Sequence, residues 1–463
     1  MSKADLAVVN GRVVTSSGVF PGGVAIRDGR IISVGDDDSL PPAVETYDCG
    51  GKHILPGLVD PHVHLGGGLP YDQILQSETA SAAAGGVTTV IQYRRAPNGS
   101  FLDTFPRDIE MCEANMRIDT WFHFILDSME QVNEIPRYAD EFGVTSYKFY
   151  MGGYEPGNPI GLVTVNDAIL FRAMELVREL GPHGYCMVHC EDDSLVSFLT
   201  DRMRSTGRED LAAYSESRPD FVEEQDIIRA IWLATKQRCQ LYIPHTTVGM
   251  AVAAAGAARL DGVRIVLETC PHYLALTPHD ERLLAQGPGV GKVAPALRDE
   301  EHQDKLWDGL HRGYIHTIGS DHVPIVKTGA GLWDEKPGFP GLATALPVVI
   351  TEGVMKNRLS LSRLAEVMAL NPARIFGLHP QKGELAVGTD GDLVVVDLER
   401  QRRVSPEMTM SEYTSPFEGK ELVGWPDLTV RRGEVIFRDG QVLAEPGSGR
   451  VVPRRADATV LPL

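Results

Sequence analysis

The stretch GYCMVHC, residues 184–190, is a short apolar run that ends at a histidine, His189, and a cysteine. Similar runs recur along the chain and alternate with helix-like segments such as residues 166–181 and 223–237. They are GLVDPHVHLGGG (57–68), GVTTVIQY (86–93), DTWFHFIL (119–126), VTSYKFYM (144–151), CQLYIPHTT (239–247), RIVLETCP (264–271) and IHTIGSDHVP (315–324). About eight strand candidates, each followed by a helix or loop, predict a closed parallel (β/α)8 TIM barrel of the α/β class. An open doubly wound sheet is the alternative.

Both ends of the chain show another pattern, the β-branched alternation of short strands separated by Asn-Gly and Asp-Gly turns. It covers residues 5–14, 23–35, 45–57, 383–398 and 427–443. We therefore expect one smaller, β-sandwich-like domain built from both termini. The expected limits are 1–55 plus 381–445 for this domain, 56–380 for the barrel, and 446–463 for a Pro- and Arg-rich extended arm.

Composition narrows the possible classes of protein. The 463 residues include 43% hydrophobic and 23% charged residues, which is typical of a globular protein. A net charge of -19 argues against a nucleic-acid-binding surface, because phosphate backbones attract clustered Lys and Arg. Six scattered cysteines without a CxxC pair favour free thiols in a reducing, cytoplasmic setting. No signal peptide or membrane span is expected, and the Ala-rich residues 249–260 are interpreted as a helix.

Polar residues that can bind metals stand at the ends of the barrel strand candidates. The carboxyl ends of TIM-barrel strands meet at one face, so we expect these side chains to converge. Two histidines at i and i+2 on an extended chain point to the same side and can bind one ion, for which zinc is a suitable choice. The residues are His62, His64, Lys148, His189, His245 and Asp321.

Taken singly, each of these residues has an ordinary explanation. An HxH pair arises by chance, a lone histidine is often a hydrogen-bonded core residue, Asp321 could cap a helix, and Lys148 could be a surface lysine. Their order at successive strand ends favours a joint site.

Lys148 is unusual among metal ligands, because nearby positive charge disfavours an ammonium group. A neutral amine can instead add carbon dioxide, and the resulting carbamate can bridge two metals.

Several motifs resemble the cyclic-amide hydrolases of the amidohydrolase superfamily. The similarity is greatest to dihydropyrimidinases and hydantoinases, and allantoinases come next. The resemblance runs in order from about residue 4 to about residue 445. The motifs are GLVDPHVHL (57–65), SYKFYM (146–151), HCE (189–191), ETCPHYLALT (268–277), GSDHVP (319–324) and NPARIFGLHPQKGELAVGTDGDLVVVDL (371–398).

The resemblance implies a site with two divalent metals, most often zinc. His62, His64 and Asp321 would bind one metal, and His189 and His245 the other. A carboxylated Lys148 would bridge the two. A hydroxide between the metals would attack a ring carbonyl, and Asp321 would act as general base and then acid. A dihydropyrimidine or hydantoin ring would open to an N-carbamoyl amino acid. The resemblance also implies a homotetramer that acts on a small molecule.

The chain departs from the family pattern around the substrate. The tyrosine that stabilises the oxyanion in hydantoinases corresponds here to Tyr154, one position later than expected, with Gly153 as the alternative. Ala294 in VAPALR replaces a serine that binds substrate mainly through its main chain. Residues 336–347, KPGFPGLATALP, look more like allantoinase or dihydroorotase, but Leu65 stands where dihydroorotase carries an arginine. Allantoinase and cyclic imide hydrolase therefore stay open as alternatives.

Two other classes of function are disfavoured. A non-catalytic scaffold of the same fold, related to dihydropyrimidinase but without its metal ligands, conflicts with the complete set of six ligand candidates. A mononuclear deaminase would not need Lys148. We interpret GPGVGK (287–292) as an ordinary loop, because it lacks the spacing of a phosphate-binding loop. Cys190 follows His189 directly, but adjacency in sequence does not make a catalytic pair.

Overall fold

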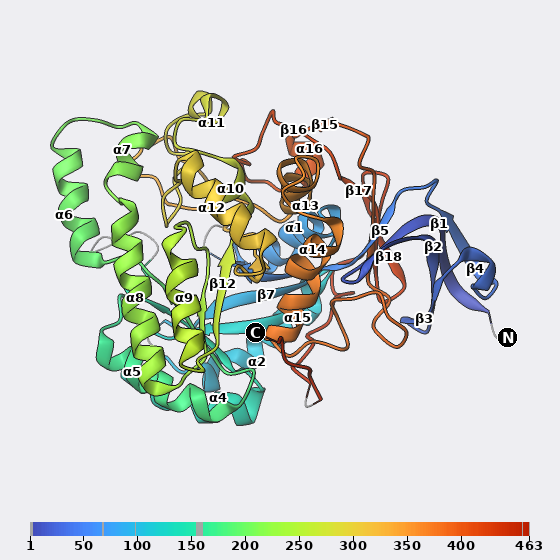
Figure 1. Ribbon diagram of the computed structural model, residues 1–463, viewed down its shortest axis with the longest axis horizontal. Helices are drawn as coiled ribbons and strands as arrows, with labels where there is room; N and C mark the ends of the chain where they lie inside the picture. The colour runs from blue at the N-terminus through green and yellow to red at the C-terminus, as the bar shows by residue number, and fades with distance from the viewer. Residues whose placement is uncertain (1–2, 67–68, 98, 154–160, 456, 463) are drawn as a thin grey trace.

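The structure is a computed structural model that describes residues 3–66, 69–97, 99–153, 161–455 and 457–462. Figure 1 shows a barrel surrounded by helices on the left and a separate sheet on the right, which contains the N-terminal strands. The C-terminal end does not stay with the sheet and lies beside α15 (Asn371–Ile375). Within the described ranges, no helix has the length and apolar character needed to cross a bilayer.

The barrel is an eight-stranded parallel sheet in which every strand pairs with its neighbours in chain order. An isolated parallel bridge between Val63 and His322 joins the first strand to the segment after the last. This closure confirms the predicted TIM barrel, and the alternative of an open doubly wound sheet is wrong. The strands are β6 (Leu58–Val63), β7 (Val87–Arg95), β8 (Asp119–Ile125), β9 (Ser146–Tyr150), β10 (Tyr185–His189), β11 (Leu241–Ile243), β12 (Ile265–Thr269) and β13 (Thr317–Ile318).

Helices cover the outside of the barrel, so most strand residues are buried on both faces. Several helices begin where a side chain accepts a backbone N–H: Ser100 caps α2, Asn166 caps α5 and Asp192 caps α6. The helices are α1 (Tyr71–Ala84), α2 (Phe101–Asn115), α3 (Met129–Asn133), α4 (Ile135–Phe142), α5 (Asp167–Val177), α6 (Asp193–Arg204), α7 (Leu211–Glu216), α8 (Asp220–Gln237), α9 (Met250–Leu260), α10 (Pro271–Ala275), α11 (Glu281–Ala285), α12 (Glu300–His311), α13 (Ala345–Val349), α14 (Leu361–Ala365), α15 and α16 (Pro406–Thr409). Short 3-10 and π-helical turns are η1 (Asp37–Ser39), η2 (Arg178–Leu180), η3 (Ile350–Val354) and η4 (Glu366–Leu370).

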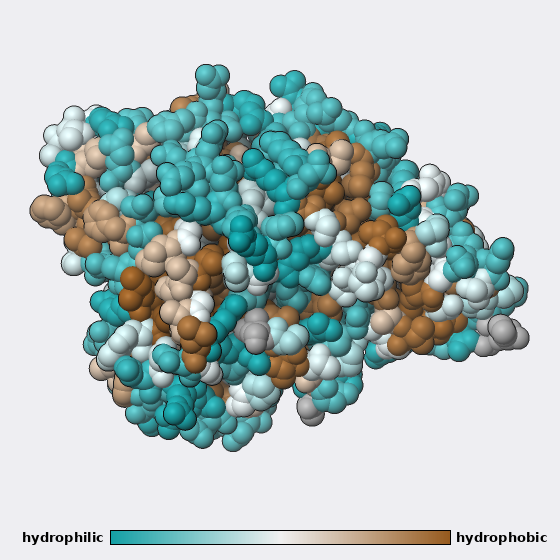
Figure 2. Space-filling model, viewed as in Figure 1, coloured by the Kyte–Doolittle hydropathy of each residue, from teal (hydrophilic) through white to brown (hydrophobic). Residues whose placement is uncertain are grey.

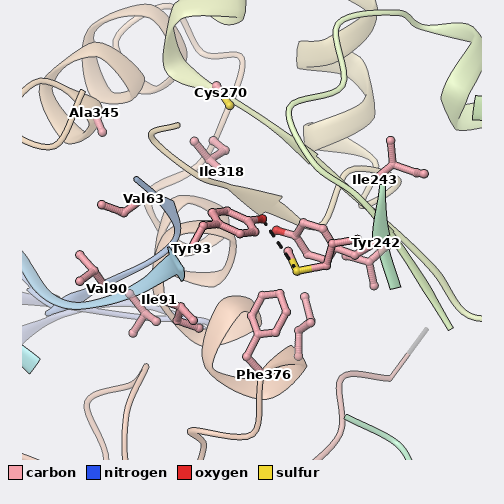
Figure 3. Packing of buried hydrophobic residues seen from close by; sticks show 14 of the residues in the cluster. Val63, Val90, Ile91, Tyr93, Tyr242, Ile243, Cys270, Ile318, Ala345 and Phe376 are labelled. Atoms are coloured by element: carbon pink, nitrogen blue, oxygen red, sulfur yellow. Dashed lines mark hydrogen bonds between the residues drawn. The ribbon is translucent and has the colours of Figure 1, made fainter. Parts of the chain in front are cut away.

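Large side chains fill the interior of the barrel (Figure 3). The Tyr242 and Phe376 rings lie 5.2 Å apart between centroids, and Phe376 also contacts Tyr185, the first residue of β10. The Tyr93 hydroxyl donates to the sulfur of Met187. Because Phe376 packs at the amino-terminal end of the strands, this end is filled, and the opposite end is left for chemistry.

The smaller sheet joins both ends of the chain, as predicted. In it, β14 pairs antiparallel with β5, and β1 pairs with β5. The sheet has its own apolar core, which includes Val8, Val24 and Ile54. Its strands are β1 (Ala4–Thr15), β2 (Gly18–Arg27), β3 (Arg30–Gly35), β4 (Ala43–Asp48), β5 (His53–Pro56), β14 (Leu393–Val396), β17 (Pro426–Arg431), β18 (Glu434–Arg438) and β19 (Gln441–Val442). A separate pair consists of β15 (Arg402–Arg403) and β16 (Glu421–Leu422). The residue limits of the domains stay a prediction.

A buried ion cluster links the barrel to the sheet. The Lys382 ammonium lies 2.6 Å from Asp119 at the start of β8 and 2.8 Å from Asp392 just before β14. The C-terminal segment joins the same region, because Val451 forms a parallel bridge with Thr120. The amino-terminal end of the barrel is therefore closed by charge pairs as well as by apolar packing.

Candidate active site

The structure brings the six predicted residues together at the carboxyl ends of the strands. His62 belongs to β6 and His64 follows it, and Asp321 lies just after β13. Asp321 Oδ1 is 3.0 Å from His62 Nε2 and 3.5 Å from His64 Nε2. The two Nε2 atoms are 3.3 Å apart. These three side chains therefore form one compact group of potential ligands.

The other three residues form a second, adjacent group. His189 ends β10, His245 lies shortly after β11, and Lys148 is in β9. His245 Nε2 is 3.1 Å from His189 Nδ1 and 3.2 Å from Lys148 Nζ. The His62 and His245 rings, 5.3 Å apart between centroids, connect the two groups.

Two of these residues have an uncommon backbone conformation. His245 has φ +42° and Asp321 has φ +47°, in the left-handed region that residues other than glycine rarely adopt. Such conformations cost about 1–3 kcal/mol and tend to occur where surrounding structure holds a functional side chain in place. Both residues follow barrel strands, so the turns aim their side chains back over the barrel mouth.

Two buried glutamates, which the sequence analysis missed, orient the histidines. Glu268 in β12 lies 2.5 Å from His62 Nδ1 and also accepts the backbone N–H of His245. Glu191 Oε2 lies 2.9 Å from His189 Nε2. Each carboxylate leaves the other ring nitrogen facing the site, as in metal centres whose ligands are held by hydrogen bonds. The available signals were the position of Glu268 at a strand end and of Glu191 two residues after His189.

The electrostatics of the metal-free site combine one charged pair with neutral imidazole groups. Burial raises the pKa of Asp321, but His62 and the hydrogen bonds from both HxH histidines outweigh this effect and hold the pKa well below its ordinary value. Burial lowers the pKa of Lys148 to about 8, and it lowers the pKa of His245 well below its ordinary value. Burial also lowers the pKa of His62, but Asp321 and Glu268 outweigh burial and raise it to about 9. The metal-free site thus holds His62 and Asp321 as a charged pair beside a neutral His245, and a metal that binds would displace the proton of His62.

The donor atoms fit a metal centre in their geometry as well. The donor atoms of His62, His64 and Asp321 all lie within 4.8 Å of one another. The nitrogens of His189, Lys148 and His245 face one another at hydrogen-bond distance, an arrangement that a shared cation would satisfy. A further group, Cys270 and His272 with Asp321, is also compact enough to bind a metal.

A cavity of about 310 Å³ opens over these residues. Ala294 lines it, as does Tyr150, which the sequence analysis did not select. Tyr93 stacks on His64 with 4.8 Å between centroids. The predicted Tyr154 lies outside the described residues. The remaining wall is largely apolar and comprises Leu65, Ile125, Leu162, Val293, Val323 and Ile325, with Arg94, Arg95 and Lys336 among the polar residues.

The two dismissed motifs show no catalytic arrangement. The Cys190 thiol donates to the carbonyl of Val188, and burial raises its pKa well above the ordinary value, so a reactive thiolate is disfavoured. Residues 287–292 form turns and loop rather than a strand–loop–helix unit.

Comparison with known proteins identifies the family. Residues 148–436 match the amidohydrolase family. An L-hydantoinase from Paenarthrobacter aurescens is 34% identical over 97% of this chain and 98% of its own length. An allantoinase from Solibacter usitatus (strain Ellin6076) is 32% identical over 97% of each chain. The solved structure of the L-hydantoinase (dihydropyrimidinase) from Arthrobacter aurescens superimposes with a TM-score of 0.89 at 33% identity, covering 97% of this chain and all of the other. The chain therefore belongs to the amidohydrolase family, in its hydantoinase and dihydropyrimidinase group.

Proposed function

We propose that this protein is a metal-dependent hydrolase that opens the ring of a cyclic amide. The substrate is a dihydropyrimidine or hydantoin, and the product is an N-carbamoyl amino acid. One observation carries the proposal: six potential ligands from five barrel strands meet beneath a cavity of about 310 Å³. Similarity to hydantoinases over nearly the whole chain supports the same activity. The scaffold alternative has no comparable use for this arrangement.

Two divalent metals, most suitably zinc, would occupy the site. His62, His64 and Asp321 would hold one, and His189 and His245 the other, with a carboxylated Lys148 as the bridge. When bound, the metals supply Lewis acidity and lower the pKa of a water molecule. The side chain of Lys148 is fully buried among the imidazoles, and a neutral amine there can add carbon dioxide, releasing one proton as the carbamate forms.

Asp321 is suited to move the proton of the reaction. Its carboxylate is held ionised by His62, so it can accept the proton of the attacking water. It would then return that proton to the ring nitrogen as the carbon–nitrogen bond breaks. Glu268 holds His62 and the backbone of His245 throughout, so the groups around the reacting carbonyl stay in place.

Substrate contacts are proposed from the cavity wall. The main chain at Ala294 would bind the ring, and Tyr154 would stabilise the oxyanion. Leu65, Ile125 and Val293 make much of the wall apolar, which suits an apolar ring substituent better than the polar ureido group of allantoin. Allantoin and cyclic imides remain the alternative substrates.

Ring-opening assays on the metal- and bicarbonate-supplemented protein test this function. Dihydrouracil, hydantoin, allantoin and a cyclic imide are compared side by side. We expect turnover of dihydrouracil or hydantoin, abolished in Lys148→Ala. Turnover of allantoin or the imide alone would retain the mechanism but change the substrate. A protein that binds no metal and opens none of the rings would refute the catalytic proposal.

We further propose that the protein works in the cytoplasm as a homotetramer. Its six free, buried cysteines suit a reducing compartment. Exposed apolar side chains on α8, namely Phe221, Ile228 and Trp232, support a self-association surface. Figure 2 shows hydrophobic patches among the hydrophilic side chains on one face of the molecule. Light scattering of the purified protein measures the oligomeric state.

A further inference from the structure

We propose that Glu191 and Arg218 form a positioning pair that couples the second metal position to the backbone at Gly153, three residues after the end of β9. Tyr150, the last residue of β9, lines the cavity. One guanidinium group would therefore hold both a metal ligand and part of the substrate wall. The inference rests on the proposed function and adds two residues to it.

The first step is the orientation of His189. Its Nε2 atom lies 2.9 Å from Glu191 Oε2, and its Nδ1 atom lies 3.1 Å from His245 Nε2. A carboxylate that accepts the Nε2 proton leaves a lone pair on Nδ1, which faces the site. Glu191 thus fixes both the tautomer and the ring plane of His189.

The second step is the link through Arg218. Its Nη1 atom lies 3.7 Å from Glu191 Oε1 and donates to the carbonyl oxygen of Gly153 at 2.9 Å. Glu191 is fully buried and Arg218 is 3% exposed. A carboxylate removed from water needs a nearby opposite charge, and here the same nitrogen also anchors the backbone after β9.

The third step is the close approach of that backbone. Gly153 has φ +86°, and a Cβ atom there would lie 2.6 Å from Glu191 Oε2 and would also clash with His189 Nε2. Only glycine fits this contact. The backbone therefore packs directly on the His189–Glu191 pair, so neither can shift without disturbing the other.

The position of Arg218 is itself fixed. Arg298 donates to the Arg218 carbonyl, and its guanidinium also binds Glu223 at 3.1 Å and the Thr247 hydroxyl at 3.0 Å. Arg298 follows Ala294 by four residues, so the part of the cavity wall at Ala294 is tied to the same cluster. Nothing in the sequence ESRPD, residues 216–220, singles out Arg218, because its partners come from other elements of the barrel.

Metal titration and steady-state kinetics of three variants test the pair. Metal-free protein is titrated with Zn²⁺ against a competing chelator, and KM and kcat are then measured on the loaded enzyme. We expect Glu191→Gln to weaken the affinity for one of the two metals about 10- to 100-fold and to leave the affinity for the other unchanged. Arg218→Met should weaken the affinity for the same metal and also raise KM. Arg218→Lys returns a charge to Glu191, but its Nζ atom is one bond nearer the backbone than Nη1 and should not reach the Gly153 carbonyl, so metal affinity should recover while KM stays raised.

A matched control separates positioning from simple stability. Glu352→Gln removes a largely buried carboxylate that pairs with Lys356 and Lys420 outside the cavity, and it should change only the melting temperature. If Glu191→Gln and Arg218→Met behave like this control, with both metal affinities and KM unchanged, the inference is overturned. If Arg218→Met does not fold, unchanged metal affinity in Glu191→Gln overturns it equally. A parent protein without metal would instead refute the proposed function.

Discussion

Two fully buried lysines at opposite ends of the barrel have opposite electrostatics. Lys148 faces a histidine nitrogen at the carboxyl ends of the strands, and burial lowers its pKa to about 8. Lys382 lies among carboxylates at the other end; burial alone would lower its pKa, but Asp119, Asp392 and Asp390 raise it above the ordinary value. Burial alone does not decide the charge of a lysine. Its partners decide whether it is a fixed cation or an amine available for chemistry.

The groups that surround the two lysines also differ between the two ends of the barrel. Asp119, Asp390 and Asp392 are close enough together to hold a metal, but the Lys382 ammonium lies 2.6–2.9 Å from each, and Arg432 also pairs with Asp119. The lysine and arginine cations already pair with these carboxylates, so the cluster needs no added metal ion. At the other end, His245 Nε2 faces a nitrogen of His189 and the Lys148 amine, and these atoms are the proposed donors to a metal.

The largest expected effect comes from Lys148→Ala. Removing the proposed bridge should eliminate bound metal at one or both positions and lower kcat/KM at least about 10³-fold, since metal activation is worth several kcal/mol. Ring opening at saturating metal and bicarbonate, together with metal content per chain, measures the loss. A variant that retains two metals and near-parent activity would show that Lys148 is not a bridge.

Lys382→Met should act on stability instead. It leaves three buried carboxylates with Arg432 as their main counter-charge, and breaking such a pair costs about 3–5 kcal/mol of unfolding free energy. Urea unfolding followed by circular dichroism measures this. The folded fraction should keep the parent kcat, because the cluster lies at the end of the barrel away from the cavity.

Metal-free Lys148→Met is the matched control for that experiment. Among the described residues, no carboxylate lies within ion-pair distance of the Lys148 ammonium. Its replacement therefore strands no buried charge and should cost far less than Lys382→Met. Equal losses in the two variants would contradict the distinction between the lysines.

The strand-end residues could be predicted because parallel topology alone brings them together. A run such as GYCMVH indicates a buried strand, and the barrel then places its last residue, His189, at the same mouth as His245 and Asp321. No side-chain detail is needed for this step. A separate signal predicts that both chain ends contribute to one sheet, because their strands show the same alternation of β-branched residues.

The residues that support the proposed ligands could not be predicted in this way. Glu268 contacts His62 across 206 positions of sequence, and Arg218 reaches Glu191 and Gly153 from the loop before α8. These contacts depend on rotamers and on which side chains meet across neighbouring strands. The Lys382 cluster was missed for the same reason, since its partners come from the barrel and from the sheet.

The smallest expected effect is a pH dependence that separates the two lysines in the metal-free protein. The pKa of Lys148 is about 8 in the folded state and about 10.4 in an unfolded chain. Between these values the unfolded state binds more protons, so the unfolding free energy should rise with pH, by at most about 1.4 kcal/mol per unit. Lys382, whose folded pKa is raised, stays protonated in both states over most of this range and adds little slope.

The measurement is the difference in unfolding free energy between the parent protein and Lys148→Met, from about pH 7.5 to about pH 9.5. Contributions from other groups largely cancel in this difference, so an upward slope isolates Lys148. Parallel curves would mean that Lys148 is as protonated in the folded state as in the unfolded state. The amine would then have little neutral form available near pH 7 to add carbon dioxide. A slope of the expected sign would show that the barrel prepares this amine for carboxylation before any metal binds.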